Sequence, residues 1–219
     1  MTVRPLALSR PPDAGHACGR GMEQFHHPRP VCAGRGSGSV PTPERQRLMA
    51  GLTGRVLEIG AGDGVKLGCY PSGVEEIVLV DPDPFLRATA KDAAAGVPAR
   101  VRILDGGPAR LPVPDASCDA VVCSLTLCCA DSAEAALFEV RRVLRPEGRL
   151  RFYEHQCSGH LAIMMTERLL TPVWSRVAGG CHPARDVLAA IGSAGFTIER
   201  LDRFHLYHVS HVLGVARPE

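Results

Sequence analysis

The 219-residue chain contains few lysines, few aromatic residues and no long apolar run. Lys66 and Lys91 are its only lysines, and its 25 basic residues nearly balance its 23 acidic ones, which leaves a formal net charge of +2. So small a charge does not favour nucleic acid or an acidic membrane surface as a partner. The apolar runs are far shorter than the ~20 residues that a membrane helix needs, and the N-terminal residues lack the apolar segment of a secretory signal. We therefore expect a cytoplasmic protein without a nucleic-acid or membrane partner.

No Cys-x-x-Cys pair occurs among the nine cysteines. Scattered cysteines of odd number, without a secretory signal, are typical of a reducing compartment, where most thiols are small buried apolar groups. Zinc-ligand types occur at His155, Cys157, His160 and the Cys181-His182 pair, but their spacing matches no closed zinc pattern. The sequence therefore predicts no metal site, and buried, unreactive thiols.

The first 42 residues differ in composition from the rest of the chain. Residues 1–43 hold seven of the 18 prolines and show no apolar periodicity. Such a segment buries too little surface to offset the conformational entropy that it would lose on folding. We predict a flexible Pro/Gly-rich arm over residues 1–42 and one domain over residues 43–219.

From residue 43 onward, short runs rich in Val, Ile and Leu alternate with helical patterns. The runs span residues 55–60, 76–81, 100–105, 118–124 and 149–154, and the helical patterns span residues 44–52, 84–95, 132–144, 161–177 and 184–194. Near-continuous apolar strands separated by helices are typical of a parallel sheet that is covered on both faces. Two more strand-like runs, residues 196–203 and 207–216, end the chain as a hairpin. The pattern predicts an α/β protein with a Rossmann-like, doubly wound sheet of seven strands, mostly parallel with an antiparallel C-terminal strand.

The densest motif consists of three alternating glycines, Gly60, Gly62 and Gly64, directly after the first predicted strand. Glycines in such a turn let backbone N–H groups approach a ligand closely. The dinucleotide fingerprint requires a further glycine at position 65, where this chain has Val65, so the diphosphate cradle is incomplete. A nicotinamide-dependent oxidoreductase therefore remains only an alternative.

Two acidic residues flank this turn. Glu58 lies in the strand two residues before the first glycine, and Asp81 ends the next strand. An acid at the end of the second strand, here Asp81, suits hydrogen bonds to ribose hydroxyls. An acid at Glu58 would attract an ammonium group and repel a diphosphate. The pair favours a nucleoside ligand that carries a positive charge.

With these motifs the chain resembles the class I S-adenosylmethionine-dependent methyltransferases over residues 43–216. The matching segments are residues 58–64, Asp81, Asp105, residues 118–124 and residues 143–148. Segments such as Tyr70-Pro71, Tyr153-Glu-His155 and Gly180-Cys-His182 are similar to the methyltransferase-like thiol methyltransferases and their bacterial relatives. The resemblance implies methyl transfer from S-adenosyl-L-methionine to a small-molecule acceptor, a thiol among the candidates, by in-line displacement.

The resemblance also implies which residues bind the donor. They are Glu58, Gly60, Ala61, Gly62, Gly64, Asp81, Pro82, Asp105, Gly106, Ser124 and Leu125. Glu58 would orient the amino-acid end of the donor, Asp81 would hold the ribose, and the turn at Asp105 would approach the adenine. Ser124 and Leu125 would lie where the methyl group is presented. We expect Glu58→Gln to weaken donor binding by about 1–3 kcal/mol.

The acceptor side is less defined by the sequence. His155 follows the fifth predicted strand and is the candidate general base, with a packing or hydrogen-bonding role as the alternative. His182 is expected to be a loop residue, and Arg87 to be a solvent-facing helix residue whose replacement has no effect. Ala109 stands where relatives commonly have an acid. Related arsenite methyltransferases use cysteines, and such a site needs at least two thiolates that meet at one point.

The arm suggests a second hypothesis for the function. After residues 25–28 it lacks the aromatic helix with which relatives usually close over the donor. The alternative to an enzyme is therefore a non-catalytic or weakly active nucleoside-binding relative with a degenerate N-terminal lid.

Overall fold

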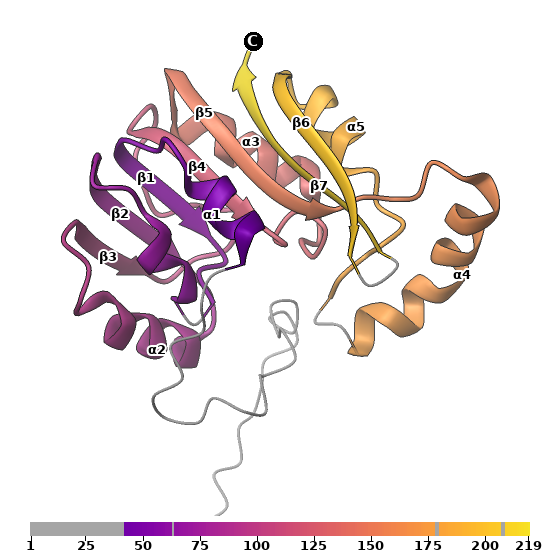
Figure 1. Cartoon of the computed structure of the whole chain (residues 1–219), viewed down its shortest axis with the longest axis horizontal. Coiled ribbons are helices and arrows are strands. Elements are labelled where there is room, and N and C mark those ends of the chain that lie inside the picture. The colour runs from indigo at the N-terminus through magenta and orange to yellow at the C-terminus, as the bar shows by residue number, and fades with distance from the viewer. Residues whose placement is uncertain (1–41, 63, 178–179, 207–208) are drawn as a thin grey trace, which may run out of the picture.

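The apolar runs of the sequence form one seven-stranded sheet in the order β3-β2-β1-β4-β5-β7-β6 (Figure 1). The computed structural model describes residues 42–62, 64–177, 180–206 and 209–219, so residues 1–41 of the predicted arm lie outside the described residues. The strands are β1 (Gly54–Ile59), β2 (Val74–Val80), β3 (Arg100–Leu104), β4 (Cys118–Ser124), β5 (Leu144–His155), β6 (Phe196–Leu206) and β7 (Val209–Pro218). Strands β1 to β5 pair in parallel, whereas β7 lies antiparallel between β5 and β6. The predicted fold class is confirmed.

The helices begin where the sequence provides capping residues. They are α1 (Pro43–Met49), the 3-10 helix η2 (Val65–Cys69), α2 (Pro84–Ala94), α3 (Ala133–Val143), α4 (Leu161–Val177) and α5 (Val187–Ser193). The side chains of Thr42, Asp83 and Ser132 accept hydrogen bonds from backbone N–H groups in the first turns of α1, α2 and α3. These bonds satisfy donors that have no partner within the helix.

Helices cover both faces of the sheet, as a doubly wound fold requires. Along β1, Leu57 and Ile59 join the apolar cluster that includes residues of α3 and α5, whereas Val56 joins the cluster that includes α1. In Figure 1, α1 lies in front of the sheet and α3 lies behind it. Full burial of one such side chain contributes roughly 1.5–3 kcal/mol to folding. A shift of β1 by one residue would exchange its two faces and lose this contribution, so the alternation fixes the register of the strand.

Two local features differ from the predicted elements. Strand β5 begins at Leu144, earlier than the predicted residue 149, because Leu144 already pairs with Cys118 of β4. A Cβ atom on Gly148 would lie 2.9 Å from Leu144 Cδ2 and 3.1 Å from Cys118 O, so a residue without a side chain fits there. The register of β4 against β5 shifts between Cys118 and Ala120, so Cys118 joins Val121 and Cys123 in one cluster rather than Ala120. A regular alternation along β4 would have placed Cys118 on the same face as Ala120.

Helix α4 projects away from the sheet on the right of Figure 1. Several of its apolar side chains are exposed, among them Leu161, Leu169 and Val173. Within the described residues, no helix is both long and apolar enough to cross a membrane.

Candidate functional site

The three glycines after β1 all adopt backbone conformations that other residues rarely take. Gly60, Gly62 and Gly64 have φ values of 70°, 60° and 78°. A Cβ atom on Gly60 would lie 3.1 Å from Thr126 Oγ1, and one on Gly64 would lie 2.9 Å from Ala93 Cβ. A Cβ on Gly62 would meet nothing within 4 Å. Packing therefore requires Gly60 and Gly64, whereas Gly62 leaves the backbone open to close approach by a ligand.

Asp81 ties the glycine turn to the end of β2. Its buried carboxylate accepts hydrogen bonds from Gly62 N at 3.1 Å and from Asp83 N at 2.9 Å. Burial raises the pKa of Asp81 above its ordinary 3.8, although both N–H bonds and Arg87 act in the opposite direction. Among the described residues, the two acids flanking the glycine turn differ, because Asp81 accepts from backbone N–H groups whereas the recorded partners of Glu58 are side chains.

Glu58 forms a buried ion pair with Lys66 of η2. Lys66 Nζ lies 2.7 Å from Glu58 Oε1, and the Tyr70 hydroxyl donates to Glu58 Oε2 at 2.7 Å. Burial, followed by the Glu58 charge, raises the pKa of Tyr70 well above its ordinary 10.0. The argument from an unpaired negative charge at Glu58 does not hold, because Lys66 already neutralises it. A lysine so close to the glycine turn, in a chain with two lysines, was the sequence signal for this pair.

Arg87 was predicted to be a solvent-facing residue, and this was wrong. Its Nη1 atom lies 2.8 Å from the carbonyl oxygens of Asp81 and Pro82 and from Asp105 Oδ1. Arg87 is in the first turns of α2, so its side chain returns over the ends of β2 and β3. It connects the two predicted ribose and adenine positions.

The chain leaves β4 through a strained residue. Leu125 has a φ of 56°, and its N–H donates to Tyr153 O at 2.7 Å. A left-handed conformation costs a residue other than glycine roughly 1–2 kcal/mol and is retained where the surroundings impose it, often at functional sites. Ser124 just before it is buried, and Thr126 Oγ1 just after it donates to Ile59 O at 2.8 Å. The ends of β1 and β4 are thereby held together.

Glu154 holds the loop that follows, a role that sequence reasoning missed. Its fully buried carboxylate accepts hydrogen bonds from the N–H groups of Thr126, Leu127 and Cys128 at 2.9, 3.0 and 3.0 Å. Burial raises the pKa of Glu154 above its ordinary 4.5, although these three bonds lower it. An acid at the end of a buried strand is the only sequence signal for this role.

His155 lies against cysteines rather than in the open. Its Nδ1 atom is 2.8 Å from Cys181 Sγ and 3.7 Å from Cys128 Sγ. Burial is the largest single effect and lowers the pKa of His155, but the hydrogen bond with Cys181 and the charges of Cys181 and Glu154 together raise it above the ordinary 6.5. Hydrogen bonds from Cys128 and Cys129, together with His155, hold the pKa of the Cys181 thiol well below its ordinary 9.0. This contact competes with the predicted role of His155 as a base, because a base must be free to accept a proton.

The chain is similar in sequence and in fold to known proteins. A family model described as a methyltransferase domain matches residues 57–152. The chain is 35% identical over 152 residues to thiol S-methyltransferase TMT1B of Rattus norvegicus, covering 67% of this chain and 62% of the relative. It is 33% identical over 156 residues to thiol S-methyltransferase TMT1A of Homo sapiens, covering 68% and 63%. The chain thus spans less than two thirds of the length of these relatives.

Solved structures show the same fold. A putative methyltransferase from Bacillus halodurans superposes with a TM-score of 0.69 at 15% identity, covering 80% of this chain and 98% of that one. A geranyl diphosphate methyltransferase solved in complex with S-adenosylmethionine superposes with a TM-score of 0.64 at 12% identity, covering 80% and 82%. Residues 57–152 thus match a methyltransferase domain.

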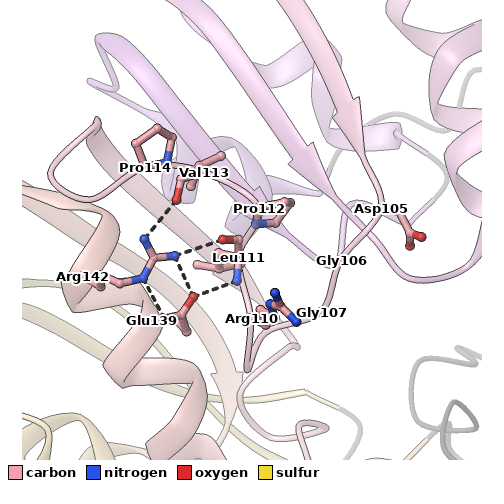
Figure 2. A pocket seen from close by; sticks show the side chains of 10 residues that line it. All are labelled: Asp105, Gly106, Gly107, Arg110, Leu111, Pro112, Val113, Pro114, Glu139 and Arg142. Atoms are coloured by element: carbon pink, nitrogen blue, oxygen red, sulfur yellow. Dashed lines mark hydrogen bonds and ion pairs between the residues drawn. The ribbon is translucent and has the colours of Figure 1, made fainter.

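A cavity of about 880 Å³ lies beside the predicted adenine position of this methyltransferase domain (Figure 2). Of the predicted donor residues, only Asp105 and Gly106 line it. The Asp105 side chain is 75% exposed, and a Cβ on Gly106 would lie 2.9 Å from Pro112 Cδ. Packing against Pro112 thus accounts for Gly106. The glycine turn and Asp81 do not line this cavity, so it marks at most the adenine end of a donor site.

A charged pair on α3 shapes the other wall of the cavity. Glu139 accepts from Leu111 N at 2.8 Å, and Arg142 donates to Leu111 O at 2.9 Å and to Val113 O at 3.0 Å, as Figure 2 shows. The Arg142 hydrogen bond holds the pKa of Glu139 below its ordinary 4.5. These contacts fix the loop of the methyltransferase domain that follows Ala109.

Proposed function

We propose that the protein transfers the methyl group of S-adenosylmethionine to a small-molecule acceptor. The observation that carries this proposal is the turn of Gly60, Gly62 and Gly64, which is open at Gly62 and bonded to the buried Asp81 carboxylate at the ends of β1 and β2. A nucleoside can approach the backbone closely there, beside a carboxylate that retains lone pairs for ribose hydroxyls. When bound, the donor supplies a methyl group that is already activated on a sulfonium, so that alignment and exclusion of water are what the protein adds.

Within this proposal, Glu58 is a positioning residue. Both of its carboxylate oxygens have partners 2.7 Å away, and the group is buried. It keeps Lys66 and Tyr70 fixed beneath the glycine turn. Asp81, the backbone around Gly62 and the Ser124–Leu125 corner are the groups that we place against the donor, with Ala61 buried behind the turn.

A thiol is the acceptor class that we propose. Relatives of 33–35% identity are named as thiol S-methyltransferases, and the chain shares motifs with that group. We expect acceptor contacts from residues 156–183, which contain α4 and its exposed apolar side chains. A small apolar thiol would suit such a lining, and its proton must leave before the sulfur attacks. His155 stays the predicted acceptor of that proton, through Nε2, because its Nδ1 is engaged with Cys181.

Calorimetric titration with S-adenosylmethionine tests the donor site. Gly62→Ala should weaken binding about tenfold, because the methyl group strains a left-handed backbone by roughly 1–2 kcal/mol and enters the open space. Gly68→Ala is the matched control, since Gly68 lies in η2 with open space around its Cβ position and no left-handed φ. Equal affinities in the two variants, with both folded by circular dichroism, would place the donor elsewhere.

Release of S-adenosylhomocysteine tests the reaction. A panel of small thiols, phenols and amines is incubated with the protein and donor, and thiols should give the fastest release. Turnover with amines or phenols alone would overturn the thiol assignment while leaving methyl transfer intact. Donor binding without turnover on any member would favour the non-catalytic relative.

A further inference from the structure

Three cysteine sulfurs meet at the C-terminal edge of the sheet, beside the candidate donor site. Cys128 and Cys129 lie in the loop after β4, and Cys181 follows α4 more than fifty residues later. Their sulfur atoms lie within 4.8 Å of one another, and all three side chains are buried. This convergence could not be read from the sequence, because the spacing of these cysteines matches no local metal-binding pattern.

The distances suit one thiophilic cation. Ligands at about 2.3 Å from a tetrahedral zinc ion are separated from each other by about 3.8 Å. Cys128 Sγ and Cys129 Sγ are 3.6 Å apart, close to that edge and far beyond the ~2.05 Å of a disulfide. The remaining sulfur separations, at most 4.8 Å, require a contraction of about 1 Å or less, which side-chain rotation supplies. We propose that Cys128, Cys129 and Cys181 bind one soft divalent cation of the zinc class.

The surroundings balance the charge of such a site. Three thiolates and one divalent cation carry a net charge of −1. Arg185 lies at the same loop, where its Nη1 donates to Leu127 O at 2.6 Å and to Ala130 O at 2.5 Å. His155 Nδ1, 2.8 Å from Cys181 Sγ, is too close to that sulfur to share the ion with it, since ligands are about 3.8 Å apart. It acts as the hydrogen-bonding partner that orients a ligand, as residues outside a metal's own ligand set commonly do.

The ion would connect two segments of different function. Backbone contacts already join them, since His182 N donates to Cys128 O at 2.9 Å. A cation on the three sulfurs would fix the segment after α4, on the proposed acceptor side, to the loop that follows Leu125 on the donor side. Three protein ligands leave the fourth position of a tetrahedral ion to water. This proposal rests on the cysteine geometry and does not depend on the methyl-transfer reaction.

Titration of the reduced 219-residue chain with Co²⁺ and then Zn²⁺, without oxygen, tests the site. Cys18 and Cys32, which lie outside the described residues, are replaced by serine in every version. We expect thiolate-to-cobalt charge-transfer absorption that saturates at one equivalent and is displaced by Zn²⁺. Cys128→Ser/Cys181→Ser should lower the Zn²⁺ affinity at least a hundredfold. Cys157→Ser, a half-buried cysteine two residues from His155 and outside the cluster, should keep it within twofold.

A second measurement keeps the test independent of how the variants fold. Zn²⁺ should protect Cys128, Cys129 and Cys181 from alkylation in the unchanged cluster, as mapped by mass spectrometry, and leave Cys157 as reactive as before. Zn²⁺ should also raise the melting temperature of this protein and not that of the double variant. Absence of charge-transfer absorption, equal protection of Cys157, or the same affinity in the double variant would overturn the site. None of these readouts uses S-adenosylmethionine, so their failure leaves the proposed function untouched.

Discussion

Lys66 and Glu58 form the residue pair whose energetics matter most for the glycine turn. Both side chains are almost fully buried, with exposed fractions of 7% and 2%. Taking two charges out of water is costly, and a buried pair recovers that cost only while both partners are present. The two residues therefore act as a unit. Replacing one of them lowers the free energy of unfolding in addition to any effect on ligand binding.

The first prediction concerns this pair. Glu58→Gln or Lys66→Met alone should lower the free energy of unfolding by roughly 3–5 kcal/mol, because each leaves a buried charge without its counterion. The double variant Glu58→Gln/Lys66→Met should lose about 1–3 kcal/mol less than the sum of the two singles. Urea unfolding followed by circular dichroism measures all four proteins. Strict additivity would mean that the two charges do not interact.

The expected effect of Glu58→Gln on donor binding is reinterpreted on this basis. Because Lys66 and Tyr70 occupy the carboxylate, a weaker affinity for S-adenosylmethionine in this variant would follow from a loosened turn. Such a loss should be partly restored in the double variant. A direct contact between Glu58 and the donor would show no such recovery.

At the scale of elements, α2 controls how the ends of β2 and β3 lie. The cap at Asp83 starts the helix, and Arg87 one turn later reaches the carbonyls of Asp81 and Pro82 and the carboxylate of Asp105. The helix thus connects the two strand ends that we place at the ribose and the adenine. A residue that contacts no ligand can in this way affect binding through backbone position.

The second prediction follows from this connection. Arg87→Ala should weaken S-adenosylmethionine binding by about 1–2 kcal/mol, because it removes hydrogen bonds of a charged donor that hold both strand ends. Lys91→Ala is the matched control, since Lys91 lies one turn further along the same helix and is exposed. Calorimetry gives both affinities. Equal losses in the two variants would remove Arg87 from the site.

The loop after β4 depends in the same way on the end of β5. Glu154 accepts three N–H groups of that loop from a fully buried position. Its folded pKa lies above the ordinary 4.5 because of burial. The folded protein therefore holds a proton there in a pH range where the unfolded chain has released it.

The third prediction is a pH dependence with a sign. In the range between 4.5 and the raised folded pKa the unfolded chain binds fewer protons at this group, so the free energy of unfolding falls as the pH rises. The stabilising contribution of Glu154 is fully present below pH 4.5 and decreases through the folded pKa. Urea unfolding from acidic to neutral pH should show this slope in the unchanged protein. Glu154→Gln should lack that part of the slope, and an equal or steeper decline in this variant would contradict the assignment.

At the scale of the whole molecule, the sheet is closed on both faces without residues 1–41. Thr42 caps α1, and Leu48 and Met49 of that helix are buried in the cluster that covers one face. The described residues thus include Thr42, the side chain that caps their first helix. The predicted boundary near residue 43 remains a prediction for the full chain.

The fourth prediction tests that boundary. A chain that begins at Thr42 should unfold with a free energy within about 0.5 kcal/mol of the full chain, as expected for changes that remove no buried contact. A chain that begins at Gly51 should lose more than about 3 kcal/mol, because it lacks the buried Leu48 and Met49. Urea unfolding compares the three. A large loss on removing residues 1–41 alone would show that the arm belongs to the folded core.

The number of strands, the doubly wound sheet and the position of the glycine turn followed from the sequence. These properties depend on local signals, because apolar periodicity selects strands and helices, and glycines permit positive φ values. The helix over residues 161–177 and the strand over residues 118–124 were predicted with the bounds that the structure has. The presence of a methyltransferase domain also rests on such ordered local motifs.

Tertiary structure alone decided which charged and sulfur-bearing side chains meet. Arg87 reaches Asp105 at the end of the next strand, Glu154 holds the loop after β4, and Cys181 reaches Cys128 across more than fifty residues. Such contacts depend on how the chain crosses from strand to strand, and periodicity carries no information about side-chain partners that are distant in sequence. The chemistry at the sheet edge is set by these long-range contacts because parallel strands bring their carboxyl ends to one place only after the whole sheet has formed.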